Sequence, residues 1–133
     1  MKNKGFTLIE LLAVIVILAI IALIATPVIL GIIDDARNGA AESTAQLVID
    51  NVELAYSTAF MKKNGVEPTI AEVAAAFKMD KATMADTGVI TVTGTTVTCN
   101  APTATSKGSV LSITCTANGK QFTTSTASNM KLG

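Results

Sequence analysis

The chain has 133 residues, 50% of them hydrophobic, and its ten basic residues balance its ten acidic residues. This length allows one modest domain, and without a net charge or a cluster of Lys and Arg we expect no direct binding of nucleic acid. Because histidine is absent and the two cysteines lie far apart in the sequence, the side chains for metal sites and for acid–base or thiol catalysis are almost lacking, and we expect no enzyme, no metal and no cofactor.

The first predicted element is an apolar helix close to the N-terminus. No charged residue occurs from Leu11 to Ile33, and at about 1.5 Å per residue such a helix can cross a hydrocarbon core of about 30 Å. Lys2 and Lys4 precede this helix and acidic residues follow it. The positive-inside bias therefore places the N-terminus in the cytoplasm and the part of the chain after the helix outside.

Two features separate this segment from a cleaved signal peptide. The apolar run continues through "IIALIATPVILGII" without a small-x-small cleavage site. Glu10 lies about one helical turn after Phe6, and a carboxylate in an apolar layer costs at least a few kcal/mol unless it is paired. No Lys or Arg occurs between Phe6 and Asp35, so the expected partner is an amino terminus at Phe6, of the same copy or of a neighbour. The alternative is a glutamate that reaches the edge of the membrane.

The stretch "KGFTLIELL", residues 4–12, resembles the N-terminal signature of type IV pilins and pseudopilins, and Pro27 falls where that family commonly has a proline. The resemblance implies that a prepilin peptidase cuts between Gly5 and Phe6 on the cytoplasmic side, and that the new amino group of Phe6 is methylated. It also implies a membrane platform protein and a cytoplasmic motor ATPase as partners. The resemblance is close over about the first thirty residues and extends in pattern over about the next thirty, whereas the C-terminal half carries no motif of the family.

Pro27 predicts a local disturbance of the helix, because it cannot donate to the carbonyl of Leu23 and its ring crowds that carbonyl. We expect the helix to kink or open there, with Gly31 adding flexibility. Filaments of the family commonly loosen before this proline, whereas Ala19 stands where many relatives have a helix-breaking glycine. The extent of loosening is therefore open.

Helical patterning continues from Asp34 to about Lys63, with good helix formers and no proline. The sequence "KKNG" at residues 62–65 is expected to end this helix. Plotted at 100° per residue, the segment has a polar face and an apolar face that we expect to form the spine of a small domain. The polar face contains Glu42, Gln46, Asp50, Glu53 and Ser57, and the apolar face contains Ala40, Leu47, Val48, Val52, Leu54, Ala55 and Ala59.

The rest of the chain predicts a short helix and a sheet. In "TIAEVAAAFKM", residues 69–79, Thr69 is placed as an N-cap and Glu72 has the spacing of a capping box. From Thr87 onward, alternating Thr and Val predict strands at about 88–93, 96–100, 109–117 and 120–126. Hairpin turns at Gly94-Thr95 and Asn118-Gly119 would join these strands in an antiparallel meander.

The predicted pairing also places the two cysteines. Across the first turn Ile90 lies opposite Cys99, and across the second Cys115 lies opposite Phe122. Both cysteines then face the buried side of the sheet. We expect a disulfide between Cys99 and Cys115, because the intervening residues suffice to return the chain antiparallel; two buried thiols are the alternative.

These elements give an α+β architecture in which a long N-terminal helix packs against a small antiparallel β-sheet, similar to the lollipop fold of pilins. The expected segments are a prepilin leader at 1–5, an apolar transmembrane and assembly half of the long helix at 6–33, its amphipathic half at 34–63, a connecting segment with a short helix at 64–87, and a β-sheet region at 88–133.

An apolar helix that leaves the membrane must be covered by other copies, because burial contributes on the order of 25 cal/mol per Å². Head-to-tail contacts that do not close into a ring give a filament. We therefore expect a homo-oligomer, the major subunit of a type IV pilus, with Phe6, Glu10 and Pro27 acting in assembly. The subunit would reside first in the inner membrane and then on the cell surface.

Two alternatives stay open at this point. The first is a pseudopilin of a type II secretion or DNA-uptake apparatus. The second, from another class, is a monomeric signal-anchored surface protein whose sheet binds a ligand. Cleavage after Gly5 distinguishes the second from a pilin, because an ordinary anchor has no reason to be cut there.

Overall fold

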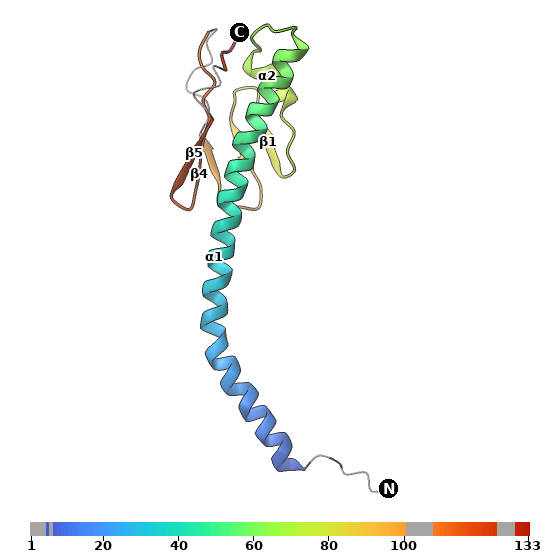
Figure 1. Ribbon diagram of the computed structural model, residues 1–133, viewed down its shortest axis with the longest axis vertical. Helices are drawn as coiled ribbons and strands as arrows, with labels where there is room; N and C mark the ends of the chain where they lie inside the picture. The colour runs from blue at the N-terminus through green and yellow to red at the C-terminus, as the bar shows by residue number, and fades with distance from the viewer. Residues whose placement is uncertain (1–4, 6, 101–107, 125–129) are drawn as a thin grey trace. The chain divides into compact units, whose positions relative to one another are not determined.

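The computed structural model describes residues 5, 7–100, 108–124 and 130–133. The chain forms two compact units, one that ends at Arg37 and one that begins at Asn38. Helix α1, Leu8–Lys62, contributes residues to both units, and every other helix and strand of the described residues belongs to the second (Figure 1). The architecture is α+β, as predicted.

The first unit consists of the apolar part of α1. The helix contains a segment long and apolar enough to cross a membrane, and none of that segment is buried within the subunit. Helical backbone continues without interruption through Pro27, so the predicted opening of the helix at this residue is not present in the described backbone.

In the second unit the C-terminal half of α1 packs against the strands, which lie beside it in Figure 1. The buried residues of α1 are Ala41, Ala45, Val48, Ile49, Val52, Ala55, Tyr56 and Ala59. Three residues of the predicted spine, Ala40, Leu47 and Leu54, are instead exposed. Leu47 lies about 100° around the helix from Val48, and the strands cover the Val48 side alone. The predicted apolar face was therefore too wide.

Helix α1 ends at Lys62, where the "KKNG" sequence placed its end. Asn64 has a φ of 54°, and its amide donates to the carbonyl of Met61 at 3.1 Å. The amide of Gly65 donates to the carbonyl of Phe60 at 3.0 Å. These two bonds form a Schellman motif, which satisfies carbonyls that the helix end leaves without a partner.

Helix α2, Ile70–Ala76, begins with the predicted capping box. The Thr69 side chain accepts a bond from the backbone of Glu72, and the Glu72 side chain accepts one from the backbone of Thr69. The helix buries Val73 and Ala74. It is shorter than predicted, because the backbone is already extended at Phe77, whose side chain belongs to the core.

The strands form two sheets and not one meander. Strands β1, Ala82–Met84, and β2, Ile90–Val92, pair antiparallel with each other. Strands β3, Thr98–Asn100, β4, Thr114–Ala117, and β5, Lys120–Thr123, form a second antiparallel sheet in the order β3-β4-β5.

The predicted hairpin across Gly94-Thr95 is therefore wrong. Ile90 pairs with Met84 and not with Cys99. The turn that forms instead is centred on "DTG", where Gly88 has a φ of 90° and donates to the carbonyl of Ala85 at 2.7 Å. A glycine with left-handed backbone at the end of a three-residue loop is a common way to close a hairpin, and this turn joins β1 to β2.

The second hairpin is confirmed. Asn118 and Gly119 have φ values of 50° and 74°, as a two-residue hairpin turn requires, and Cys115 pairs with Phe122 as predicted. Cys115 also pairs with Cys99 on β3, and the two form a disulfide.

The first part of the predicted strand 109–117 pairs differently, with the C-terminal residues. Val110 forms an isolated bridge with Lys131. The amide of Leu111 donates to the carbonyl of Met130 at 2.6 Å. Leu132 is 1% exposed, so this segment closes one side of the core. The end of the predicted strand 120–126 lies outside the described residues.

Candidate assembly site

The first turn of α1 carries a reciprocal cap formed by Thr7 and Glu10. The backbone N–H of Thr7 donates to Oε2 of Glu10 at 3.2 Å, and the backbone N–H of Glu10 donates to the Thr7 hydroxyl at 3.3 Å. This is the arrangement of a capping box, and it holds the carboxylate at the N-terminal end of the helix. This cap was not predicted, because Glu10 was assigned to assembly alone, although Thr7 and Glu10 have the same T-x-x-E spacing as Thr69 and Glu72.

The predicted processing site lies directly before this cap. Gly5 is exposed, and a Cβ added at Gly5 would meet no described atom within 4 Å. Phe6, the predicted new N-terminus, lies outside the described residues. Cleavage, methylation and the pairing of the Phe6 amine with Glu10 therefore stay predictions.

The helix near Pro27 contains one additional side-chain bond. The hydroxyl of Thr26 donates to the carbonyl of Ala22 at 2.6 Å. This bond adds a donor in the turn where Pro27 supplies none, and bonds of this kind often accompany a slight bend. The assembly role of Pro27 stays a prediction.

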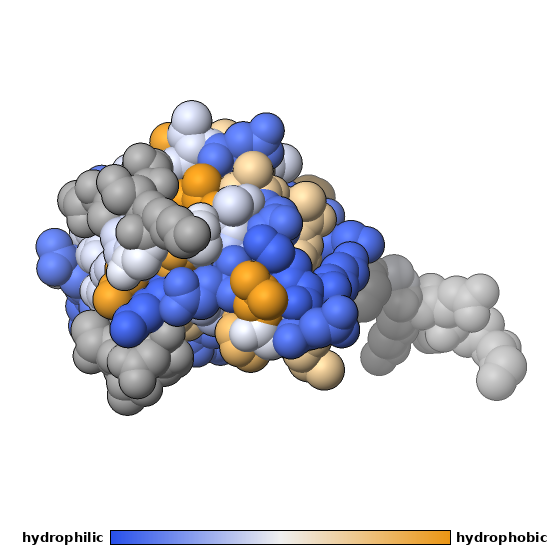
Figure 2. Space-filling model, turned by 90° about the horizontal axis from the view of Figure 1, so that it is seen from above, coloured by the Kyte–Doolittle hydropathy of each residue, from blue (hydrophilic) through white to orange (hydrophobic). Residues whose placement is uncertain are grey.

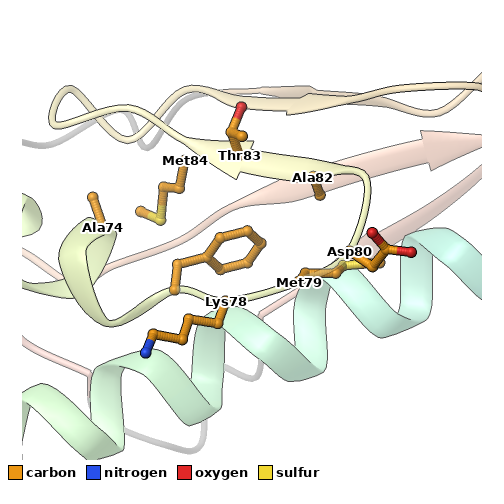
Figure 3. A pocket seen from close by; sticks show the side chains of 8 residues that line it. Ala74, Lys78, Met79, Asp80, Ala82, Thr83 and Met84 are labelled. Atoms are coloured by element: carbon orange, nitrogen blue, oxygen red, sulfur yellow. The ribbon is translucent and has the colours of Figure 1, made fainter.

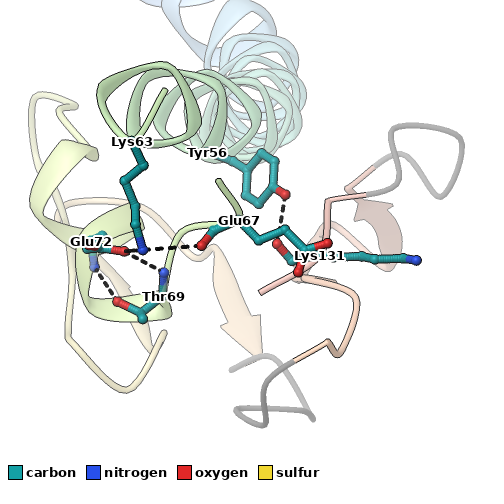
Figure 4. A network of polar contacts seen from close by, with 6 residues as sticks. All are labelled: Tyr56, Lys63, Glu67, Thr69, Glu72 and Lys131. Carbon is teal, nitrogen blue, oxygen red and sulfur yellow. Dashed lines mark hydrogen bonds and ion pairs between the residues drawn. The ribbon is translucent and has the colours of Figure 1, made fainter. Parts of the chain in front are cut away.

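In the second unit a polar network joins the end of α1, the start of α2 and the C-terminal segment (Figure 4). Lys63 lies 3.0 Å from Oε2 of Glu72 and also donates to the carbonyl of Glu67 at 3.3 Å. The bond from the Thr69 backbone N–H, together with Lys63, holds the pKa of Glu72 below its ordinary value. The hydroxyl of Tyr56 donates to the carbonyl of Lys131 at 2.7 Å.

A second polar link ties the β4–β5 turn to α1. Asn118 donates to Oε1 of Glu42 at 3.0 Å, and Lys120 lies 3.2 Å from Oε2 of Glu42. The bond from Asn118 and the bond from Lys120 hold the pKa of Glu42 below its ordinary value. Local sequence patterns gave no signal for this link, because its partners are far apart in the chain.

A hollow of about 550 Å³ lies between the end of α2 and β1 (Figure 3). It is lined by Ala74, Phe77, Lys78, Met79, Asp80, Ala82, Thr83 and Met84. Lys78 and Asp80 are its charged side chains, and a single pair of this kind is not a convergent catalytic set. Within the part of the chain that the structure describes, no group of three or more His, Cys, Asp or Glu could hold a metal ion.

The candidate functional site therefore consists of the apolar segment of α1 and its capped N-terminal end. Comparison with known proteins bears on both. The family described as "Prokaryotic N-terminal methylation motif" matches residues 1–26. No solved structure matches the chain.

A relative matches along most of the chain. The chain is 38% identical over 101 residues to the type IV narrow pilus major component PilA5 of Thermus thermophilus, an alignment that covers 76% of this chain and 82% of the relative. The match extends well beyond the N-terminal motif and so includes much of the second unit. The chain belongs to the type IV pilin family.

Proposed function

We propose that this chain is the structural subunit of a type IV pilus filament and that the apolar halves of its α1 helices form the filament core. The observation that carries the proposal is an apolar, membrane-length segment that has no buried residue within the subunit. Such a segment is not stable in water. It needs either a bilayer or other copies of itself, and a filament subunit meets these two environments in succession.

The methylation motif and the relative support the same function. The motif at residues 1–26 is the part of the chain that processing would read, and the relative is named as a major component of a type IV pilus. That name favours a pilus over a secretion apparatus. The precursor is anchored in the cytoplasmic membrane through the apolar part of α1, and the assembled subunit lies on the cell surface. The role is structural and not enzymatic.

The proposal assigns each segment a task. Residues 1–5 are a leader that prepilin peptidase removes, and residues 6–33 leave the membrane for the filament core. Residues 34–63 join this core to the surface formed by the connecting segment at 64–87 and the β-sheet region at 88–133. A membrane platform protein and a motor ATPase would drive the transfer.

The test combines electron microscopy of sheared surface filaments with intact-mass measurement of their main subunit. We expect filaments whose subunit begins at Phe6 and has gained one methyl group. A surface-anchored protein that binds a ligand would instead give no filaments and a subunit that begins at Met1. A mass that corresponds to a cut near Ala25 would also overturn the proposal.

A further inference from the structure

The dipeptide Asn-Gly occurs three times in the chain, at residues 38–39, 64–65 and 118–119. In a flexible chain this dipeptide readily loses the side-chain amide of asparagine, because glycine has no side chain to hinder attack by its own backbone nitrogen. All three pairs are exposed. The end of α1, next to residues 64–65, lies on the face seen in Figure 2, where hydrophilic residues predominate. Contact with water therefore does not distinguish the three sites.

The backbone amide that would attack differs among the three sites. Gly39 lies inside α1, and the helical pattern bonds its N–H to the carbonyl four residues earlier. The N–H of Gly65 donates to the carbonyl of Phe60 at 3.0 Å. Gly119 lies in the turn between β4 and β5, and its N–H has no hydrogen bond to another described residue. Because attack requires the nitrogen to lose its proton, the unbonded N–H makes Gly119 the most reactive of the three glycines in the folded chain.

The β4–β5 turn also leaves room for the ring that this attack forms. Apart from its neighbours in the chain, a Cβ added at Gly119 would meet no described atom within 4 Å, so the tip of the turn can rotate without moving the core. The Asn118 side chain is held by a bond from Nδ2 to Oε1 of Glu42 at 3.0 Å. This bond is exposed, and water competes for both of its partners. It therefore holds the amide for only part of the time.

We propose that Asn118 is a site of spontaneous deamidation in the folded protein, with water as the co-reactant. The backbone nitrogen of Gly119 attacks Cγ of Asn118 and forms a new C–N bond. The bond between Cγ and Nδ2 breaks, and ammonia leaves with the proton from the Gly119 nitrogen. The product is a cyclic succinimide. Water then opens the ring at one of its two carbonyls, which gives aspartate or isoaspartate at position 118.

The modification reverses an interaction that joins the β4–β5 hairpin to α1. Nδ2 of Asn118 donates to Glu42, whereas either product carries a carboxylate, which cannot donate and which repels the Glu42 carboxylate. Lys120, at 3.2 Å from Oε2 of Glu42, is then left to hold the link. Isoaspartate also lengthens the backbone of a two-residue turn, and the length of such a turn fixes the register of its strands. We expect the hairpin to be held less firmly against α1 after the reaction.

Peptide mapping of the full chain in detergent tests the site. After reduction, cleavage behind lysine and arginine separates the three asparagines into the peptides 38–62, 64–78 and 108–120. During incubation of the folded chain at mildly alkaline pH, peptide 108–120 is expected to gain the mass difference between an amide and an acid and to give two products on chromatography. Asn38 and Asn64 are expected to react at least about ten-fold more slowly, because their glycine amides react only after local opening.

The same chain unfolded in denaturant is the matched control. All three glycine amides then lack their structural hydrogen bonds, so we expect similar rates at the three sites. Equal rates at the three sites in the folded chain would overturn the proposal, and so would a rate at Asn118 as low as those at Asn38 and Asn64. Neither outcome bears on the proposed function, which is tested by the presence of filaments and the mass of their subunit.

The effect of the new charge is tested by melting curves of variants. Asn118→Asp is expected to lower the melting temperature of the second unit. In a chain that also carries Glu42→Gln, the same substitution is expected to cause a smaller fall, because the carboxylate that repels the new charge is absent. No fall with Asn118→Asp alone, or an equal fall in both chains, would overturn the proposed effect on the link between the hairpin and α1.

Discussion

The backbone N–H of Thr7 donates to the carboxylate of Glu10 at 3.2 Å, and Thr7 accepts a bond from the Glu10 backbone in return. Glu10 therefore already has a local partner before any second copy arrives. The carboxylate has two oxygens, and the cap uses Oε2. A neighbouring amine could pair with Oε1 while the cap stays intact, so Thr7 would orient Glu10 for assembly.

We expect Thr7→Ala to lower filament yield with cleavage and membrane insertion intact, and Thr7→Ser to keep near-normal yield. Loss of a capping hydroxyl costs about 1 kcal/mol, which corresponds to about a five-fold change in the population of the oriented carboxylate. Quantitative immunoblots of sheared filaments and of membranes measure both pools. Equal yields from the Ala and Ser variants would show that the cap has no part in assembly.

Glu10→Ala is expected to abolish filaments or to reduce them severely while processed subunit accumulates in the membrane. If the Phe6 amine pairs with Glu10 as predicted, the gross attraction would be about 4 kcal/mol at about 4 Å and an effective dielectric of about 20, from which desolvation subtracts a share. Glu10→Gln is expected to be milder, because an amide oxygen still accepts a hydrogen bond. Mass spectrometry of the membrane pool checks that cleavage still occurs, and normal filament yield from the Ala variant would rule out the pairing.

Removal of the Cys99–Cys115 disulfide is expected to lower the free energy of unfolding of the second unit by about 3 kcal/mol in the chain-entropy model. For a unit of this size, the melting temperature should fall by more than about 10 °C. Circular dichroism of detergent-solubilised subunit, with and without reductant, makes the measurement. A Cys99→Ala/Cys115→Ala variant serves as a control and should be insensitive to reductant. If reductant leaves the melting temperature of the unaltered chain unchanged, the bridge does not stabilise the unit.

The link from Glu42 to Asn118 and Lys120 predicts a pH dependence of stability. The folded-state pKa of Glu42 is lowered from its ordinary value of 4.5, so its stabilisation is present above that value and is lost as the pH falls through the folded-state pKa. Glu42→Gln should therefore melt lower than the unaltered chain at pH 7 and approach it in acid. Asp86→Asn, at a position with no ion pair in the described part of the chain, is the matched control and should follow the unaltered chain. The prediction would be contradicted if the difference in melting temperature between Glu42→Gln and the unaltered chain were the same at every pH.

The parts of the fold that local chemistry determines could be predicted from the sequence. The capping box of Thr69 and Glu72 and the turn at Asn118-Gly119 depend on neighbouring residues, and both occur where expected. The partner of β2 could not be predicted in this way, because two glycine turns competed and only the packed core decides between them. Cys99 illustrates the difference. Its disulfide with Cys115 was predicted, but the residue opposite it in the sheet was predicted to be Ile90 and is Cys115.

The candidate site divides in the same manner. Gly5, Phe6 and Glu10 were selected by a short contiguous motif, whereas Leu47 and Leu54 were assigned to the core because a helical plot shows apolar faces without showing which of them is covered. Leu47 and Leu54 are exposed because the core forms on the side of α1 that carries Val48 and Val52, which a helical plot does not reveal. Glu42 appeared as one member of a polar face, and its partners come from a distant hairpin.

The exposure of the apolar segment also bears on the reversibility of the filament. Lipid chains and the side chains of neighbouring helices are about equally apolar, so moving this segment from the bilayer to a filament core changes its hydrophobic free energy little. The large cost lies in passing through water, which neither state requires. The balance between the two environments then depends on the few polar groups along the helix, such as Glu10 and Asp34. The hydrophobic effect therefore favours neither the membrane nor the filament strongly, and the apolar segment itself sets no large barrier to exchange between them.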